Sequence, residues 1–288
     1  MLSWIGEKML DFLKAILFGI VEGITEWLPI SSTGHMILLE EFVKMDVTKE
    51  FWNLFLVVIQ LGAILASVIL FWNKIWPFQK PNKAEGKSIF KVDTWMLLFK
   101  VGVACIPGVI FAVLGIDDIC DKYFYNGVGV SVALIVFGIV FILVENWNKK
   151  REAKVADLSG MTFKLAILIG IFQLLAAAFP GTSRSGATII GALILGVSRT
   201  AASEFTFILA IPAMLGASLL ELKDFLEMGM TMGGTEIGIL LAGVVVAFIV
   251  SVFVIKFLMG YIKKHDFKVF GWYRIALGIV VLLYFMIF

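Results

Sequence analysis

Six stretches of about twenty apolar residues determine what this chain can fold into. They cover residues 51–73, 94–115, 127–147, 200–220, 237–258 and 269–288. A helix of about 20 mainly apolar residues is long enough to cross the hydrocarbon core of a bilayer. With 60% hydrophobic and 16% charged residues among 288, the chain is too apolar for a soluble globular domain. We therefore expect an all-α, polytopic membrane protein that forms a single membrane domain over residues 1–288.

Two further apolar segments, residues 10–44 and 162–197, are interrupted near their middles. Pro29 breaks the first and Pro180 the second, and a turn rich in Ser, Thr and Gly follows each proline. The half-stretches are too short to cross comfortably, and non-helical backbone at membrane depth is tolerated only where protein or a water-filled cavity surrounds it. The sequence thus predicts two re-entrant helical hairpins.

The loops between the apolar stretches differ in charge. Lys and Arg are concentrated in 74–93, in 148–164 and just before residue 269, whereas the loops around 117–121 and 221–236 are acidic. Cytoplasmic loops of membrane proteins carry an excess of Lys and Arg. We therefore expect the basic loops inside, the acidic loops and both termini outside, and the two hairpins entering from opposite faces.

An internal repeat relates the two halves of the chain. A shift of 151 residues places Pro29 over Pro180, Ser32 over Ser183 and Glu22 over Gln173. The halves, 8–150 and 160–288, would each contain one hairpin and three spanning helices, and three crossings turn the second half upside down. Inverted-topology repeats bring interrupted helices together near the midplane. The polar turns of both hairpins are therefore expected to form one site.

The first polar run begins with two carboxylates. Glu22 and Glu26 are four residues apart, so they share one helix face. Two such groups in a poorly hydrated site either share a proton or hold a divalent cation such as Mg²⁺ or Ca²⁺. The metal assignment is thus Glu22 and Glu26, and a carboxylate pair without metal stays open.

Hydroxyl groups and a histidine follow the first proline. Ser31, Ser32 and Thr33 supply hydroxyls and turn amides, although Ser and Thr also commonly cap helices. His35 is suited to act as a general acid or base, with a hydrogen-bonded packing role as the alternative. One hypothesis for the geometry is Ser32 as nucleophile, His35 as base and Glu26 as the carboxylate that orients it.

The second polar run follows Pro180 and has the composition of a phosphate site. Arg184 offers a fork of donors that matches phosphate oxygens, and a Ser/Gly-rich turn that opens a helix offers amides and a positive dipole end. The alternative is that Arg184 neutralises Glu22 or Glu26 as a structural ion pair. The residues assigned to phosphate binding are Ser31, Ser183, Arg184, Ser185 and Thr188.

Other site types are not indicated. Cys105 and Cys120 give neither a disulfide framework nor a metal-ligand spacing. No basic patch is interleaved with stacking aromatic residues, so a nucleic-acid partner is not expected.

The two runs together resemble a known family. Glu22-Gly-Ile-Thr-Glu26-Trp-Leu-Pro-Ile-Ser-Ser-Thr-Gly-His35 and Pro180-Gly-Thr-Ser-Arg184-Ser-Gly-Ala-Thr188 are similar to motifs of the bacterial undecaprenyl-diphosphate phosphatases, also called the bacitracin-resistance family. The resemblance covers nearly the whole chain. It implies a divalent-cation-dependent enzyme of the bacterial plasma membrane, with its site open to the outer face, that recycles the lipid carrier of cell-wall synthesis. A polyprenyl diphosphate lipid and the bilayer would be its partners, and a homodimer is a possible assembly.

The resemblance also implies roles for individual residues. Glu22 and Glu26 would serve the cation and proton transfer, and Ser32 and Thr33 would contact or attack the terminal phosphate. His35 would act as acid or base, and the second motif would hold the phosphoryl oxygens through Arg184, Ser183 and Ser185. Attack by Ser32 and attack by an activated water both remain open.

Two other functions are compatible with parts of the sequence. Inverted repeats with broken helices are typical of secondary transporters, so a transporter or flippase for an anionic or prenyl-phosphate lipid is the main alternative. A second superfamily of membrane phosphatases requires a histidine after its Ser-Arg pair. No histidine follows Ser183-Arg184 or Ser198-Arg199 within reach, which argues against that mechanism.

Overall fold

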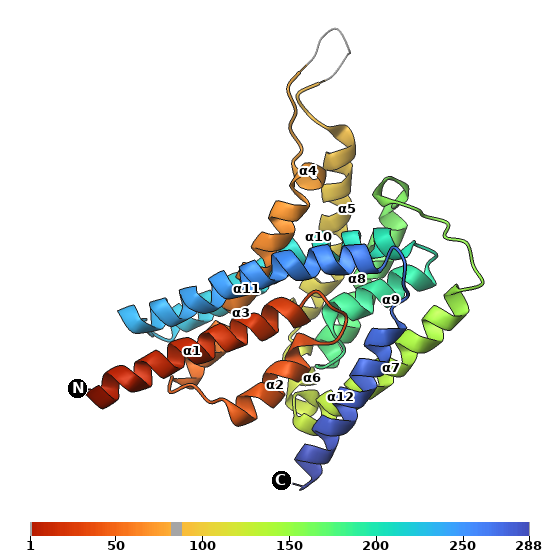
Figure 1. Cartoon of the computed structure of the whole chain (residues 1–288). Coiled ribbons are helices and arrows are strands. Elements are labelled where there is room, and N and C mark those ends of the chain that lie inside the picture. Colours follow the sequence, from red (N-terminus) through yellow and green to blue (C-terminus); the bar gives the residue numbers. More distant parts are fainter. Residues whose placement is uncertain (1, 82–87, 288) are drawn as a thin grey trace.

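The computed structural model describes residues 2–81 and 88–287, and this part of the chain consists of helices joined by turns and loops. Its β pairing is limited to two isolated bridges, Phe78 with Phe90 and Val155 with Val197. The helices, shown in Figure 1, are α1 (Leu2–Thr25), α2 (Ser32–Phe42), α3 (Lys49–Leu70), α4 (Trp72–Ile75), α5 (Val92–Val113), α6 (Ile116–Phe124), α7 (Gly127–Asn148), the 3₁₀ turn η2 (Leu158–Gly160), α8 (Phe163–Ala178), α9 (Arg184–Ile194), α10 (Arg199–Glu227), α11 (Gly234–Tyr261) and α12 (Lys268–Ile287).

Six of these helices are long and apolar enough to cross a membrane, namely α3, α5, α7, α10, α11 and α12. They coincide with the six apolar stretches of the sequence, so this prediction is confirmed. The largest difference is at the end of α10, which continues to Glu227 instead of ending near residue 220. The extension is stabilised because Phe225 packs into a buried cluster with Phe18, Phe51 and Phe55.

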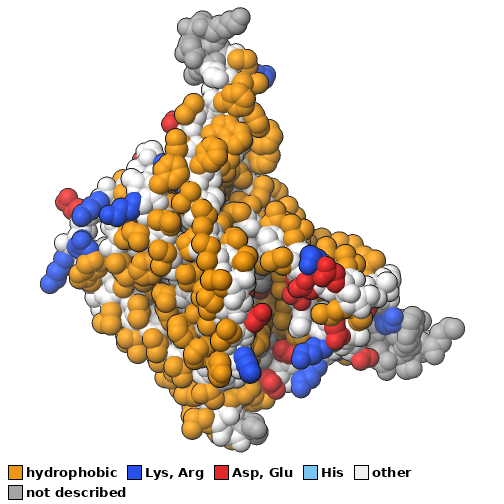
Figure 2. Space-filling model, turned by 180° about the vertical axis from the view of Figure 1, so that it is seen from behind, with side chains coloured by type: hydrophobic (Ala, Val, Ile, Leu, Met, Phe, Trp, Pro, Cys, Tyr) orange, Lys and Arg blue, Asp and Glu red, His pale blue; other side chains and the backbone are white. Residues whose placement is uncertain are grey.

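The outer surface of the spanning helices is apolar. Phe253 is 68% exposed and Val113 is 80% exposed, and many other large apolar side chains also point outward. Figure 2 shows hydrophobic side chains over most of one face, with charged side chains gathered at its left edge and in a group right of the centre. Apolar surface of this extent is typical of a protein surrounded by lipid. The protein is therefore a multi-pass membrane protein.

Four helices form two pairs at the interrupted segments. The helices α2 and α9 have 11 residues each and α8 has 16, so all three are shorter than a spanning helix. The first arm differs from expectation, because α1 has 24 residues and begins well before residue 10. Length alone therefore does not prevent α1 from crossing, but Lys8, Asp11 and Lys14 make its first half polar.

Long helices pack against the first helix of each pair and against one another. The helix α1 packs along α11, α8 packs along α5, and α7 packs along α12. Glycines allow these close approaches, since a Cβ atom on Gly19 would lie 2.6 Å from the Gly243 carbonyl oxygen and one on Gly138 would lie 2.7 Å from that of Gly271. Small residues at helix crossings are a common way to bring backbones together in membranes. The two interrupted segments are thus fixed within the bundle.

Large aromatic side chains surround the two turns. Trp27, which follows α1, is fully buried and meets Phe207 of α10 edge to face, with ring centroids 5.0 Å apart. Phe205 and Phe141 belong to the same buried cluster. The two turns are therefore packed against a buried apolar cluster.

Candidate active site

The two polar turns end in the same unusual conformation. Ser31 and Ser183, which precede α2 and α9, have φ values of 74° and 72° and are the only non-glycine residues with positive φ in the described part of the chain. Their side chains accept hydrogen bonds from Gly34 N (3.3 Å) and Gly186 N (3.1 Å), so each caps its helix. Such backbone costs roughly 1–3 kcal/mol per residue and persists only where the surroundings enforce it.

This shared conformation differs by one residue from the correspondence that the shift of 151 residues predicts at the turns. The shift of 151 places Ser32 over Ser183, whereas the structure makes Ser31 the counterpart of Ser183. The reason is turn length, because one residue separates Pro29 from its cap and two residues separate Pro180 from its cap. Ser32 and Arg184 therefore occupy equivalent positions as the first residues of α2 and α9.

These two first residues meet at one carboxylate. The Ser32 hydroxyl donates to Glu26 Oε2 at 2.8 Å, and Arg184 Nη2 donates to Glu26 Oε1 at 2.8 Å. The Ser185 hydroxyl donates to the Glu26 backbone carbonyl at 3.2 Å. Glu26 is only 8% exposed. Residues 158 positions apart in sequence are thus joined in one site, and the Arg184–Glu26 ion pair forms within it.

Glu22 lies one helical turn before Glu26 and is 1% exposed. Its Oε1 atom has no hydrogen-bond partner. A buried carboxylate oxygen without a partner is costly, so it requires a proton, a cation or an ordered water. No group of three or more His, Cys, Asp and Glu side chains forms a metal site among the described residues. A cation here would take its other ligands from the substrate or from water.

Helix α10 supports the Arg184 guanidinium. Arg184 Nη1 donates to the Thr206 carbonyl at 3.5 Å, and Arg184 Nη2 contacts the Met214 sulfur at 3.3 Å. The Arg184 side chain is 16% exposed. Thr188 is fully buried, and its hydroxyl donates to the Arg184 carbonyl at 3.0 Å while accepting from Thr206 at 2.9 Å. Thr188 therefore fixes the start of α9 from inside the protein.

The second turn presents its serines differently. Ser185 is buried and Ser183 is half-buried, and their hydroxyl oxygens lie 3.1 Å apart. Of the residues assigned to phosphate binding in this motif, Ser183 and Arg184 are thus the ones with exposed side-chain surface.

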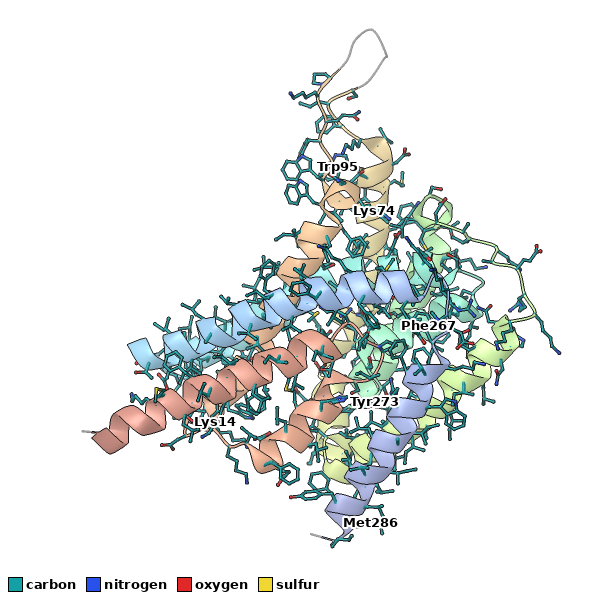
Figure 3. All side chains as sticks on the ribbon, in the orientation of Figure 1. Lys14, Lys74, Trp95, Phe267, Tyr273 and Met286 are labelled. Atoms are coloured by element: carbon teal, nitrogen blue, oxygen red, sulfur yellow. The ribbon has the colours of Figure 1, made fainter. Side chains whose placement is uncertain are left out.

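His35 has a different set of partners from that in the sequence-derived hypothesis. Its Nδ1 lies 2.7 Å from the Ser31 carbonyl oxygen, so Nδ1 carries a proton, and its Nε2 lies 2.7 Å from the Tyr273 hydroxyl. The two rings are stacked, with centroids 5.6 Å apart. Figure 3 shows Tyr273 of α12 on the side that faces α2. Ser32 donates directly to Glu26, without His35 between them.

Two other positions named from the sequence have polar atoms without partners. The Thr33 side chain is half-buried and forms no hydrogen bond to another described residue. Gln173, which the repeat places over Glu22, has a buried Oε1 atom without a partner, as Glu22 does. The two positions that the shift of 151 residues superimposes thus share this property.

Arg274 joins the two turns and was missed by the sequence reasoning. It is fully buried in α12, where Nη1 donates to the Pro29 carbonyl at 3.3 Å and Nη2 to the Gly181 carbonyl at 3.0 Å. The rings of Phe137 and Phe141 lie 6.0 Å from its guanidinium carbon. The available signal was an arginine within an apolar stretch, since ionisable residues at membrane depth are usually functional.

Comparison with known proteins identifies the family of this chain. Residues 15–280 match the family described as bacitracin resistance protein BacA. The chain belongs to this family. Among its relatives, the undecaprenyl-diphosphatase of Enterococcus faecalis is 57% identical over 274 residues, which are 95% of this chain and 97% of the relative. That of Desulfitobacterium hafniense is 59% identical over 277 residues, 96% and 97% of the two chains. Undecaprenyl-diphosphatase 1 of Clostridium acetobutylicum is 56% identical over 278 residues, 96% and 98%.

In this BacA family member, replacing Arg274 by alanine is expected to reduce stability by about 3–5 kcal/mol. The substitution leaves two buried carbonyls without a donor, at roughly 1–3 kcal/mol each, and opens a cavity beside Phe137 and Phe141. The measurement is the melting temperature in detergent, which should fall by roughly 10 °C.

Lys268→Ala is the matched control on the same helix. Lys268 pairs at 3.2 Å with Asp266, both side chains are 24% exposed, and an ion pair near the surface contributes about 0–1 kcal/mol. If Arg274→Ala melted at the same temperature as Lys268→Ala, Arg274 would not be holding the two turns together.

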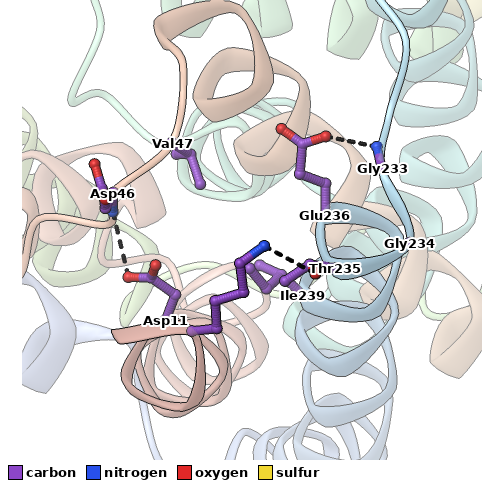
Figure 4. Close-up of a pocket in the computed structure, with 9 residues that line it drawn as sticks. Asp11, Asp46, Val47, Gly233, Gly234, Thr235, Glu236 and Ile239 are labelled. Carbon is purple, nitrogen blue, oxygen red and sulfur yellow. Dashed lines mark hydrogen bonds between the residues drawn. The ribbon is translucent and has the colours of Figure 1, made fainter. Parts of the chain in front are cut away.

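A separate polar cavity lies between α1 and the start of α11 (Figure 4). It measures about 400 Å³, and its polar groups are paired with one another. Lys8 Nζ donates to Thr235 Oγ1 at 3.1 Å, Asp46 N donates to Asp11 Oδ1 at 3.3 Å, and Gly233 N donates to a Glu236 oxygen at 2.7 Å. None of the residues that contact Glu26 lines this cavity, so the cavity lies apart from the candidate active site. The hydrogen bond from Lys8 to Thr235 joins α1 to α11.

Proposed function

We propose that this chain hydrolyses undecaprenyl diphosphate to undecaprenyl phosphate and inorganic phosphate. The observation that carries the proposal is the convergence of Ser32 and Arg184 on Glu26, in a chain whose relatives at 57% and 59% identity are named undecaprenyl-diphosphatases. The product renews the lipid carrier for peptidoglycan and other wall polymers. Bacitracin binds the substrate lipid, so resistance to this antibiotic follows from the same activity.

The geometry favours an anionic phosphate between the two turns. Helices α2 and α9 begin at the residues that contact Glu26, and the first amides of a helix together with its dipole favour negative charge. Arg184 adds a guanidinium whose fork matches phosphate oxygens. Phosphoryl transfer depends mainly on positioning and on stabilising negative charge, which these groups supply.

Ser32 is the nucleophile that this arrangement supports. Its hydroxyl donates to Glu26 Oε2, so the carboxylate accepts the proton as Ser32 Oγ attacks the terminal phosphorus. The bond from that phosphorus to the bridging oxygen breaks, and undecaprenyl phosphate leaves. Water then cleaves the phosphoserine and releases inorganic phosphate. His35 of α2 and Tyr273 of α12, which are hydrogen-bonded to each other, form a second proton-transfer pair.

The carboxylates also fit a divalent cation. The unpartnered Oε1 of Glu22 is a hard oxygen ligand, and Mg²⁺ is usually held by one or two carboxylates together with substrate phosphates. Glu22 and Glu26 would hold such a cation, which supplies charge neutralisation and polarisation of a phosphoryl oxygen. Two carboxylates face one arginine in this site, so a diphosphate needs additional positive charge.

Trapping experiments test the role of Ser32. Wild-type protein incubated with substrate labelled in the terminal phosphate is expected to retain covalent label after acid quenching. Ser32→Ala should retain none, because the attacking oxygen is absent, whereas the neighbouring Thr33→Val should still be labelled. Phosphate release by wild type without any trapped label under single-turnover conditions would favour attack by an activated water.

We further propose that the interrupted segments are re-entrant hairpins in an inverted repeat of 8–150 and 160–288. The glycines that the repeat relates support this, since Gly19 lies against Gly243 of α11 and Gly170 lies against Ala104 of α5. In Figure 1 both chain ends lie toward the lower left and the bottom, whereas α4 lies at the top and the α7–α8 connection on the right. The termini and acidic loops would face outward from the plasma membrane, with the site open on that side.

The main test of the proposed function uses purified protein in detergent with Mg²⁺ or Ca²⁺. Phosphate release from undecaprenyl diphosphate requires no sealed compartment, whereas transport does. Absence of release would shift the interpretation to a transporter or flippase for an anionic or prenyl-phosphate lipid. The same preparation tests a homodimer, which would show twice the 31.9 kDa protein mass after correction for detergent.

A further inference from the structure

A basic cavity lies apart from both polar turns, where α7 and α11 end and α10 begins. It measures about 460 Å³ and is lined by residues from three segments. Its cationic side chains are Lys149, Arg151, Arg199, Lys263 and Lys264. Neither Glu26 nor any residue bonded to it lines this cavity, so it is separate from the candidate active site.

The positive charge of the cavity is only partly neutralised. Asp266 is its one lining carboxylate and pairs with Lys149 at 3.7 Å. Arg199 makes a forked contact with the fully buried Glu145, through Nε to Oε1 at 2.9 Å and Nη2 to Oε2 at 2.5 Å. The remaining three cations, Arg151, Lys263 and Lys264, are exposed and have no carboxylate partner within residues 2–81 and 88–287.

An apolar groove adjoins the basic cavity along α7. It is lined by Leu143, Val144, Trp147 and Ile194 and measures about 310 Å³. The Arg151 guanidinium lies 3.9 Å from the centre of the Trp147 ring, so one stacked pair joins the groove to the cavity. Tryptophan at the end of a spanning helix is typical of the membrane interface.

We infer that this end of the molecule binds an anionic phospholipid of the surrounding bilayer. The phosphate headgroup lies in the basic cavity against Arg151, Lys263 and Lys264, and an acyl chain follows the apolar groove. Clusters of basic residues next to spanning helices attract anionic lipids, and a free anion would make no use of the groove. The continuity of charged and apolar surfaces therefore selects a lipid over a soluble phosphate.

The test compares lipid retention by the full chain in nanodiscs containing phosphatidylglycerol or phosphatidylcholine. Native mass spectrometry of wild type is expected to show retained phosphatidylglycerol. The variant Arg151→Ala/Lys263→Ala/Lys264→Ala should bind it about 100-fold more weakly, because each basic residue near the membrane surface contributes roughly fivefold. Trp147→Ala should weaken retention by roughly tenfold through loss of the groove wall.

The control removes three charges from the basic loops 74–93 and 148–164, at residues that do not line the cavity. Lys80→Ala/Lys150→Ala/Lys164→Ala is expected to retain phosphatidylglycerol as wild type does, and melting in phosphatidylcholine establishes that all variants are folded. Equal retention by both triple variants would overturn the inference. So would stabilisation by inorganic phosphate that matches the effect of phosphatidylglycerol and is insensitive to Trp147→Ala, since that would identify a simple anion site.

Discussion

Glu26→Gln is expected to lower the rate of phosphate release from undecaprenyl diphosphate by about 10³-fold, within the range for loss of a general acid–base group. Glu26 accepts the Ser32 hydroxyl on one oxygen and Arg184 on the other. A glutamine side chain has nearly the same shape, but it cannot take the proton of Ser32. The loss should therefore be seen mainly in kcat, measured with purified protein in detergent at saturating substrate.

Glu41→Gln is the control for this substitution. Glu41 lies on α2 with its side chain exposed and away from the turn, so the activity of this variant should be unchanged. Melting temperatures of both variants should stay close to that of wild type. Near-normal kcat in Glu26→Gln would show that another group accepts the proton of Ser32.

The spanning helices were predictable because their signal is length and composition. An uninterrupted run of about twenty apolar residues has few structural alternatives, and all six runs form helices of this kind. The end of α10 was not predictable from hydropathy. The segment after residue 220 is polar in composition, and it stays helical because Phe225 is buried against residues of α1 and α3.

The sequence indicated which residues form the candidate site, but it did not indicate which hydrogen bonds join them. A Pro followed by Ser, Thr and Gly at membrane depth marks both turns, whatever their exact conformation. Ser31 and Ser183 are equivalent in conformation because the two turns differ in length by one residue, which a constant sequence shift does not reveal. Likewise, the sequence places His35 near Ser32, but its hydrogen bond to Tyr273 crosses 238 positions.

Arg274 shows a second limit of sequence reasoning. Its hydrogen bonds go to the backbone carbonyls of Pro29 and Gly181, and carbonyl acceptors leave no trace in residue types. A carboxylate partner would have suggested an ion pair, but none of the carboxylates that the structure describes is bonded to the Arg274 guanidinium. The only indication of a role for Arg274 was the energetic cost of an arginine within an apolar stretch.

Arg184→Ala is expected to reduce kcat/KM by about 10³- to 10⁴-fold, in the range seen when an arginine that stabilises phosphoryl transfer is removed. The guanidinium is held by Glu26 and Thr206 while part of its surface stays accessible, so it is positioned to contact a phosphate. Arg184→Lys should remain about 10²-fold below wild type, because a lysine ammonium keeps the charge but lacks the planar fork. Steady-state kinetics of the three proteins provide the comparison.

The same variants distinguish a phosphate clamp from a structural ion pair. If Arg184 served only to neutralise Glu26, Arg184→Lys would keep nearly full activity, and Arg184→Ala would have no further effect in Glu26→Gln, where residue 26 no longer carries a charge. If Arg184 holds the phosphate, removing it should still reduce the residual activity of Glu26→Gln, by at least about tenfold, since one charge-assisted hydrogen bond contributes roughly 1.5–3 kcal/mol. Groups that act as a unit are not additive, so this second loss should be smaller than the first. The double variant therefore separates the two roles, because only the clamp predicts a loss that persists without the carboxylate.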